Sequence, residues 1–221
     1  MSQTVVVTGA NKGIGLEFCA HYKSKGATVV AVCRSLSEPL QALDVEVVEG
    51  VDVSTDQGIG HLTEVLNGRS IDILINNAGI FSNQTLADLD FSEVSRQFEV
   101  NAVGPLRVTH ALQGQLNRGA KVALVTSRMG SITDNTSGAY YGYRMSKAAL
   151  NAAGMSLAND LKPKGVAVAI LHPGFVQTSM VGYAGDISPA TAAERLAQRI
   201  EELTLESSGT FWHSNGDVLP W

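Results

Sequence analysis

The chain lacks several features that would indicate a membrane, a nucleic acid or a secretory route. It has no cluster of lysine or arginine, and its formal net charge of −5 argues against a nucleic-acid-binding surface. No apolar run approaches the roughly 18 residues of a membrane-spanning helix. The first apolar run begins near residue 4, which leaves no room for a cleavable signal peptide. We therefore expect a cytoplasmic protein that binds neither nucleic acid nor a membrane.

Cysteine is also scarce in this sequence. Only Cys19 and Cys33 are present, and their positions do not have the spacing of metal ligands. We expect both to be buried, reduced thiols, as in a reducing compartment, and we predict no metal site.

Apolar segments alternate with amphipathic segments, and the hydrophobic content of 44% is enough for one core. The expected strands are Thr4–Thr8, Ala27–Cys33, Val45–Val51, Ile71–Asn76, Lys121–Thr126, Val166–Leu171 and Thr210–His213. The expected helices are Gly13–Lys25, Asp56–Leu66, Phe91–Leu116, Ala139–Leu161 and Pro189–Leu205. The first six strands are continuous apolar runs, as in strands covered on both faces. This order predicts one α/β domain over residues 1–221, a Rossmann-type doubly wound parallel sheet of about seven strands with helices on both faces.

The most informative segment is Thr8–Gly15, T-G-A-N-K-G-I-G, between an expected strand and an expected helix. Glycines spaced G-x-x-x-G-x-G let the backbone turn tightly and approach a pyrophosphate, and the helix N-terminus supplies free N–H groups. No G-K-[ST] follows, which disfavours a nucleotide-triphosphate loop. Taken alone, the glycines also fit a tight turn without a ligand. The residues expected to contact a dinucleotide here are Gly9, Asn11, Lys12, Gly13 and Ile14.

The end of the second expected strand indicates which dinucleotide is preferred. The chain there is Cys33-Arg34-Ser35, and the next acidic residue is Glu38. An acidic side chain would bind the 2′-OH of the adenosine ribose, whereas a cation favours a 2′-phosphate. Arg34 and Ser35, together with Lys12, therefore predict NADP(H) in preference to NAD(H). Arg34 also fits an ordinary surface residue.

Tyr143 and Lys147 stand four residues apart in an expected helix, which places them on one face. An ammonium about 4 Å from a phenolate interacts with it by roughly 4 kcal/mol at an effective dielectric constant of about 20. Burial acts in the opposite direction, because it disfavours the charged phenolate. We expect Lys147 to prevail and to lower the pKa of Tyr143 from about 10, so that the tyrosine serves as a general acid and base. Alone, the pair also fits a surface tyrosine with a packed ring.

At this point the chain resembles the short-chain dehydrogenase/reductase family along essentially its whole length. Thr8–Gly15 is similar to the family's T-G-x-x-x-G-x-G motif, and Asn76–Gly79 to its N-N-A-G. Tyr143–Lys147 is similar to its Y-x-x-x-K. Asn101 falls at the family's helix asparagine, and Ser127 falls at its serine after the fifth strand.

Further segments resemble the family's nicotinamide loop and one of its branches. Pro173, Gly174, Val176 and Thr178 fall at the loop that covers the nicotinamide. The segments that resemble the branch of C-factor and sniffer-type carbonyl reductases are Ser127–Ser131, Asp134–Thr136 and Leu219–Trp221. The stretch between Ser127 and Tyr143 is longer than is usual in the family, which leaves the shape of the substrate pocket open.

The resemblance implies hydride transfer from a nicotinamide to a carbonyl carbon. It implies that Tyr143 gives a proton to the developing alkoxide and that Ser127 hydrogen-bonds the same oxygen. It further implies that Lys147 binds the nicotinamide ribose and that Asn101 holds a water connecting Lys147 to solvent. The further cofactor residues that it implies are Asp52, Val53, Asn77, Ala78, Gly79, Pro173, Gly174, Val176 and Thr178. Asp52 would read the adenine amino group, although it also fits a helix cap or a loop acid.

The substrate pocket is expected to include Ser127, Met129, Tyr143 and Phe175, with Met180 and Tyr183 as further apolar candidates. Such a lining favours an aldehyde, ketone or quinone over a charged metabolite, although methionine and aromatic residues also fit a core. The short, glycine-containing segment 179–187 predicts an open and mobile pocket.

The predicted function is therefore NADPH-dependent reduction of a small-molecule carbonyl. The alternative is a cofactor-binding signalling protein of C-factor type with little or no turnover. A sugar epimerase or dehydratase is disfavoured by the glycine spacing and by the lack of a large C-terminal substrate domain. The resemblance leaves a homo-oligomer open.

Overall fold

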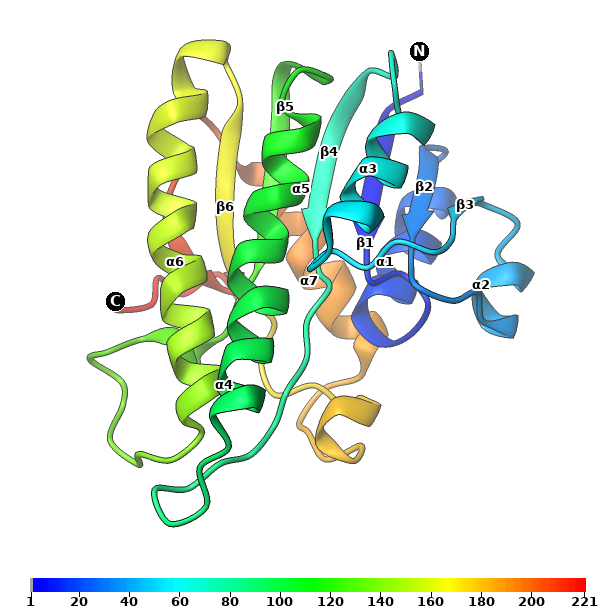
Figure 1. The fold of residues 1–221 in the computed structure, drawn as a ribbon. Helices are drawn as coiled ribbons and strands as arrows, with labels where there is room; N and C mark the ends of the chain where they lie inside the picture. The colour runs from blue at the N-terminus through cyan, green and yellow to red at the C-terminus, as the bar shows by residue number, and fades with distance from the viewer. Residues whose placement is uncertain (1) are drawn as a thin grey trace.

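The computed structural model describes residues 2–221, and its seven strands form one parallel sheet (Figure 1). The strands are β1 (Thr4–Thr8), β2 (Thr28–Val32), β3 (Glu46–Val48), β4 (Ile71–Asn76), β5 (Leu116–Val125), β6 (Ala167–His172) and β7 (Phe211–His213). Their order in the sheet is β3-β2-β1-β4-β5-β6-β7, so the chain crosses from one half of the sheet to the other between β3 and β4. The predicted Rossmann-type doubly wound sheet is confirmed.

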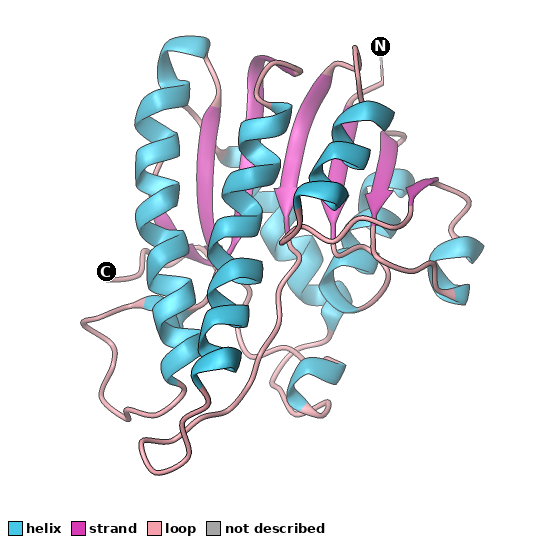
Figure 2. Ribbon diagram, in the orientation of Figure 1, coloured by secondary structure: helices cyan, strands magenta, loops and turns pink. Residues whose placement is uncertain are grey.

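Helices cover both faces of this sheet, as Figure 2 shows. The helices are α1 (Gly13–Ser24), α2 (Glu38–Ala42), α3 (Asp56–Val65), α4 (Phe91–Phe98), α5 (Gly104–Leu112), α6 (Tyr141–Leu161) and α7 (Pro189–Glu202). Alternate residues of each strand enter two separate cores. Val6 of β1 packs with Leu62 and Leu150 on the α3–α6 face, whereas Val5 packs with Phe18 and Leu196 on the α1–α7 face. Burial on both faces explains the continuous apolar runs of the strands.

The helix expected over Phe91–Leu116 is interrupted. A π-helical turn, Glu99–Val103, separates α4 from α5, and the Gly104 N–H donates to the Glu99 carbonyl five residues earlier. Pro105 has no N–H to give to the carbonyl of Asn101, so a regular helical bond is absent there. Leu116 lies in β5, which begins earlier than expected and passes an irregularity opposite Ile71–Ile73.

Smaller differences concern element ends. The short helix α2 was not expected, and the Ser37 hydroxyl caps it by accepting from the Leu40 N–H. Helix α6 begins at Tyr141 rather than Ala139, because Ala139 and Tyr140 have φ of +53° and +55°. No helix within residues 2–221 is both long enough and apolar enough to span a membrane.

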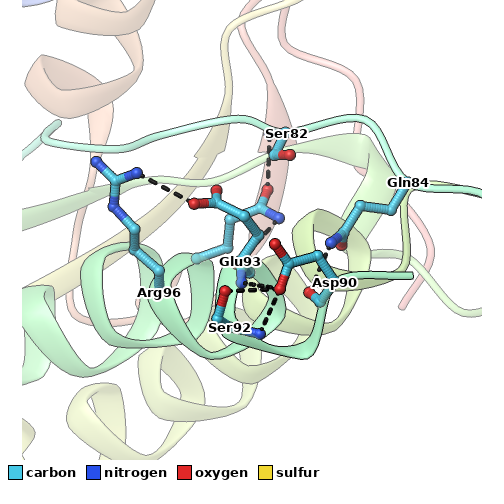
Figure 3. Close-up of polar contacts among 7 residues, drawn as sticks. Ser82, Gln84, Asp90, Ser92, Glu93 and Arg96 are labelled. Atoms are coloured by element: carbon cyan, nitrogen blue, oxygen red, sulfur yellow. Dashed lines mark hydrogen bonds and ion pairs between the residues drawn. The ribbon is translucent and has the colours of Figure 1, made fainter. Parts of the chain in front are cut away.

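The carboxyl ends of β1, β4, β5 and β6 all reach the lower edge of the sheet in Figure 1, where the connecting loops gather. In such a sheet, ligands bind outside the strand ends at the point where the strand order reverses. The loop after β4 is tied to α4, as Figure 3 shows: the Ser82 N–H donates to Gln97 Oε1 and Gln84 Nε2 donates to the Asp90 carbonyl. Asp90 in turn caps α4 by accepting from the Ser92 N–H.

Candidate active site

The glycine loop between β1 and α1 brings the backbone close to the end of β4. Gly9 has a φ of +66°, and a Cβ there would lie 2.8 Å from the Cα of Ala78. A Cβ on Gly15 would collide with the Gly9 carbonyl oxygen. Lys12, the N-cap residue of α1, offers no side-chain cap, so the first N–H groups of the helix are free for an anion.

The segment after β4 is fixed to the glycine loop by side-chain hydrogen bonds. Asn77 Nδ2 donates to the carbonyls of Thr8 and Gly9 at 3.1 and 3.2 Å. The Thr8 hydroxyl accepts from the N–H groups of Asn77 and Ala78 at 3.1 and 3.2 Å. The two strand ends on either side of the crossover are therefore held as one rigid wall.

Helix α6 carries Tyr143 and Lys147 beside the end of β5. Lys147 is buried, and its Nζ donates to the Val125 carbonyl at 3.0 Å. The same Nζ lies 5.7 Å from the centre of the Tyr143 ring. Ser127 lies two residues after the end of β5, and its Oγ accepts from the Met129 N–H at 3.1 Å. The rings of Phe81 and Tyr143 pack edge to face, with centroids 5.0 Å apart.

Burial dominates the protonation of this pair. It raises the pKa of Tyr143 to about 12, against the lowering effect of a hydrogen bond with Ser127. It lowers the pKa of Lys147 to about 8. We expected Lys147 to lower the pKa of Tyr143, but without a bound cofactor the pKa is raised. The cost of burying a charged phenolate exceeds the effects that lower the pKa. Tyr143 is held in its protonated form, which suits a proton donor.

Asn101 lies in the π-helical turn and is fully buried. Its Oδ1 accepts from the Ile80 N–H at 2.8 Å, and its Nδ2 donates to the Ile80 carbonyl at 2.9 Å and to Ser146 Oγ at 3.0 Å. A Cβ on Gly79 would lie 3.2 Å from Asn101 Oδ1 and 3.7 Å from Lys147 Nζ. Asn101 thus lies across Gly79 from the lysine, while its bonds to Ile80 also give it a structural role.

A cleft of about 200 Å³ runs along the glycine loop and the strand ends. The expected cofactor residues that line it are Gly9, Asn11, Lys12, Gly13, Ile14, Arg34, Asp52, Val53, Asn77, Ala78, Gly79, Tyr143, Lys147, Pro173 and Thr178. Ser35, Gly174 and Val176 do not line it. Ser35 is exposed outside the cleft, and the other two border a second cavity.

Sequence reasoning missed some residues of this cleft. These are Val32, Cys33, Val51, Ile80, Val100, Val125, Thr126, Ser179 and Met180. Several of them, such as Val32 and Val125, are the last residues of strands. Their place at the strand ends was therefore a usable signal, because parallel strands end at one edge of the sheet.

A second cavity of about 500 Å³ adjoins the cleft. All four expected substrate residues, Ser127, Met129, Tyr143 and Phe175, line it, and so does Met180. Tyr183 does not line it: the residue is 72% exposed, and its backbone has a φ of +63° just beyond the short turn Ser179–Val181. The lining residues that were not expected are Ile14, Phe81, Thr126, Arg128, Asp134, Ser137, Tyr140, Arg144, His172, Pro173, Gly174, Val176, Thr178 and Val181.

The loop that precedes α6, residues 128–140, lines this cavity and is anchored at both ends. The Trp221 carbonyl accepts from the Thr133 N–H at 2.8 Å and from Ser131 Oγ at 3.1 Å. The Trp221 ring stacks on Phe211 of β7 with centroids 5.3 Å apart. At the other end, the Tyr140 N–H donates to the Gln84 carbonyl at 2.6 Å. The wall of the cavity is therefore built from segments far apart in the sequence.

Three charged residues, Arg34, Lys12 and Asp52, line the part of the cleft where the sequence predicts the adenosine. The pKa of Asp52 is lowered overall. Burial alone would raise it, but hydrogen bonds from Ser54 and the charges of Arg34 and Arg96 together outweigh burial, so the carboxyl is ionised. Its Oδ1 accepts from the Ser54 N–H at 2.9 Å and from Ser54 Oγ at 2.6 Å, whereas the cap of α3 is Thr55. Within residues 2–221, Arg34 has no carboxylate within 4.0 Å.

The family model described as short chain dehydrogenase matches residues 3–189 of this chain. The chain belongs to the short-chain dehydrogenase/reductase family. It is 41% identical over 224 residues to the "1-hydroxy-2-glutathionyl-2-methyl-3-butene dehydrogenase" of Rhodococcus sp. (strain AD45), with 99% of each chain covered. It is 45% identical over 162 residues to the "C-signal" of Myxococcus xanthus, covering 72% of this chain and 97% of that protein.

Among solved structures, the NADPH-bound carbonyl reductase from chicken fatty liver superimposes with a TM-score of 0.89 and 28% identity. The superposition covers 100% of this chain and 99% of that one. These similarities identify an oxidoreductase of the short-chain dehydrogenase/reductase family, of the carbonyl reductase and C-factor type. They confirm the resemblance that the motifs indicate.

A dinucleotide, the cofactor of short-chain dehydrogenases, fits the first cleft on structural grounds. Gly13 has a φ of +56°, and a Cβ there would meet only the Thr178 side chain, at 3.4 Å. The α1 N-terminus lacks a side-chain cap and has no acidic residue in its first turn, so nothing there repels a pyrophosphate. The cleft continues past Gly79 to Lys147 and Tyr143, where a nicotinamide would end.

Proposed function

We propose that this protein is an NADPH-dependent reductase of aldehydes, ketones or quinones. The observation that carries the proposal is the position of Tyr143, which borders both the cofactor cleft and the second cavity. Lys147 lies on the cleft side of this shared wall and Ser127 on the other. A carbonyl group in the second cavity would therefore meet a proton donor at the boundary with the cofactor.

When bound, the nicotinamide supplies a hydride to the carbonyl carbon. Tyr143 donates its phenol proton to the carbonyl oxygen, so that the C=O group becomes CH–OH. The Ser127 hydroxyl accepts from the Met129 N–H, and its own proton, which otherwise faces the Tyr143 oxygen, would turn to the same substrate oxygen and form a small oxyanion site. Lys147 would bind the ribose hydroxyls of the cofactor and would stabilise the phenolate left on Tyr143. Asn101, across Gly79, is assigned the water that returns a proton to Lys147.

The preference for NADP(H) over NAD(H) is also proposed. Arg34 and Lys12 line the cleft and are exposed, without an acidic neighbour within ion-pair distance among the described residues. A 2′-phosphate gains charge-assisted hydrogen bonds from such side chains. The NADPH-bound chicken reductase supports this assignment.

The test is the loss of NADPH absorbance with a panel of aldehydes, ketones and quinones, and with NADH as the paired cofactor. We expect turnover of several carbonyls with NADPH and weaker turnover with NADH. Because the Rhodococcus relative is named for an alcohol substrate, the panel includes alcohols with NADP⁺. Near-normal turnover by Tyr143→Phe would refute the catalytic assignment.

The second candidate is a cofactor-binding signalling protein, favoured by the 45% identity to the Myxococcus "C-signal". Tight NADPH binding without turnover across the whole panel would favour this candidate.

We further propose a cytoplasmic location, with no nucleic-acid or membrane partner. Both cysteines are free and buried, as a reducing compartment allows. Light scattering would test the homo-oligomer that the family resemblance leaves open.

A further inference from the structure

The second cavity contains one guanidinium that no carboxylate neutralises. Arg144 lies near the start of α6 and lines this cavity. Its Nε donates to the Gly138 carbonyl at 3.2 Å, its Nη1 to the Met129 carbonyl at 3.4 Å and its Nη2 to Ser137 Oγ at 2.9 Å. All three acceptors are neutral. No carboxylate within residues 2–221 lies within 4.0 Å of it.

The other charged groups of the cavity cancel one another. Arg128 forms an ion pair with Asp134, and both side chains line the same cavity. His172 is neutral near pH 7, because burial and the adjacent His213 lower its pKa to about 3. Arg144 therefore leaves a net positive charge in a cavity whose other walls include Met129, Phe175 and Met180.

Arg144 lies near the N-terminus of α6, where a positive charge does not stabilise the helix. A cation near a helix N-terminus faces the positive end of the helix dipole. Helix α6 has no acidic residue in its first turn, and its N-cap residue, Tyr140, provides no side-chain cap. The helix end and the guanidinium thus both present positive potential to the loop and cavity.

We propose that the second cavity binds substrates that carry a carboxylate, with Arg144 as the group that holds it. This inference rests on the proposed function. The guanidinium donates to the Met129 carbonyl and to Ser137 Oγ, whereas the Tyr143 ring packs on Phe81, so the two groups contact different parts of the cavity lining. A bidentate pair between a guanidinium and a carboxylate fixes orientation as well as adding affinity.

The test compares two aldehydes on the same ring, 4-formylbenzoate, which carries a negative charge, and its methyl ester, which is neutral. For the wild-type protein with NADPH, we expect kcat/KM for the carboxylate to exceed that for the ester by about tenfold. In Arg144→Gln the ratio falls to about one. In Arg144→Lys, which keeps the charge but not the planar fork, part of the preference remains.

The readout is the ratio, because a loosened loop would lower both rates alike. The matched control is the double variant Arg128→Gln/Asp134→Asn, which removes the neighbouring ion pair without changing the net charge. It keeps a preference within about twofold of the wild-type value. An unselective wild-type protein would overturn the inference, and so would a preference that survives in Arg144→Gln or disappears in the double variant.

Calorimetry separates this inference from the proposed function. The protein with saturating NADP⁺ is titrated with each of the two aldehydes, so that binding is measured without turnover. Tighter binding of 4-formylbenzoate than of the ester, lost in Arg144→Gln, supports the carboxylate site even if no aldehyde is reduced. Turnover of both aldehydes with equal affinity leaves the reductase proposal standing and overturns the carboxylate site.

Discussion

The cofactor cleft and the second cavity share one wall, yet they are built in different ways. The cleft follows the glycine loop and the ends of β1, β2, β4 and β5, so short motifs of sequence encode most of it. The second cavity is formed by the loop before α6, the segment after β6 and Phe81 from the loop after β4. The backbone geometry needed for a common cofactor is local, whereas the chemistry that selects a substrate is assembled from distant loops.

Removing the hydroxyl of Tyr143, which borders both the cleft and the second cavity, should have the largest effect on turnover. We expect Tyr143→Phe to lower kcat by about 10²–10⁴-fold, because the proton donor is lost, while NADPH affinity changes little. The assay is steady-state reduction, paired with an NADPH binding titration. Tyr141→Phe is the matched control, since Tyr141 lies on the same helix and lines neither cavity. Equal losses in both variants would count against a chemical role for Tyr143.

A side chain at Gly9 should damage the cleft and the fold together. The added Cβ would lie 2.8 Å from the Ala78 Cα at a φ of +66°. We expect Gly9→Ala to lower the free energy of unfolding by about 2–5 kcal/mol and to weaken NADPH binding. Gly26→Ala is the control, because Gly26 has a φ of +80° but open space around it. Its cost is about 1 kcal/mol in urea unfolding, and similar costs for both variants would contradict the close approach.

The buried charge of Lys147 predicts a pH dependence of stability. Burial lowers its folded-state pKa to about 8 from the ordinary value of 10.5, so between these values the unfolded chain binds more protons. Stability contributed by this group therefore rises as the pH increases through that window. Relative to Lys147→Met, the wild-type protein should gain roughly 2 kcal/mol between about pH 8 and pH 10. A constant difference in urea unfolding free energy across this range would contradict the burial of a charged lysine.

The smallest expected effect concerns cofactor choice at the adenosine end of the cleft. Arg34→Ala should reduce the ratio of kcat/KM for NADPH over NADH by about tenfold, because one of the two cations proposed to bind the 2′-phosphate is lost. Lys25→Ala, in the turn after α1, is the control for a general change in net charge. An unchanged kcat/KM ratio in Arg34→Ala would show that Arg34 does not bind the 2′-phosphate.

Much of the fold and cleft could be predicted because the signals are short and periodic. Continuous apolar runs gave the strands, and the glycines of Thr8–Gly15 gave the turn. The ends of helices were less predictable where single residues alter the backbone conformation. Examples are Pro105, just after the π-helical turn, and Ala139 and Tyr140, whose positive φ precedes α6. Arg144 and His172 could not be assigned to a cavity, because only the folded loops bring them together. The pKa of Tyr143 was misjudged because its burial depends on packing that the sequence does not display.

The contact between Trp221 and the segment at Ser131 and Thr133 gives the molecule an optical reporter of its own. The chain has two tryptophans, and Trp212 packs against the core on the other side of the sheet. Replacing Trp212 with phenylalanine would leave one emitter, whose fluorescence registers any rearrangement of that segment when a substrate enters. Ligand entry can then be timed in a stopped-flow instrument without attaching a dye.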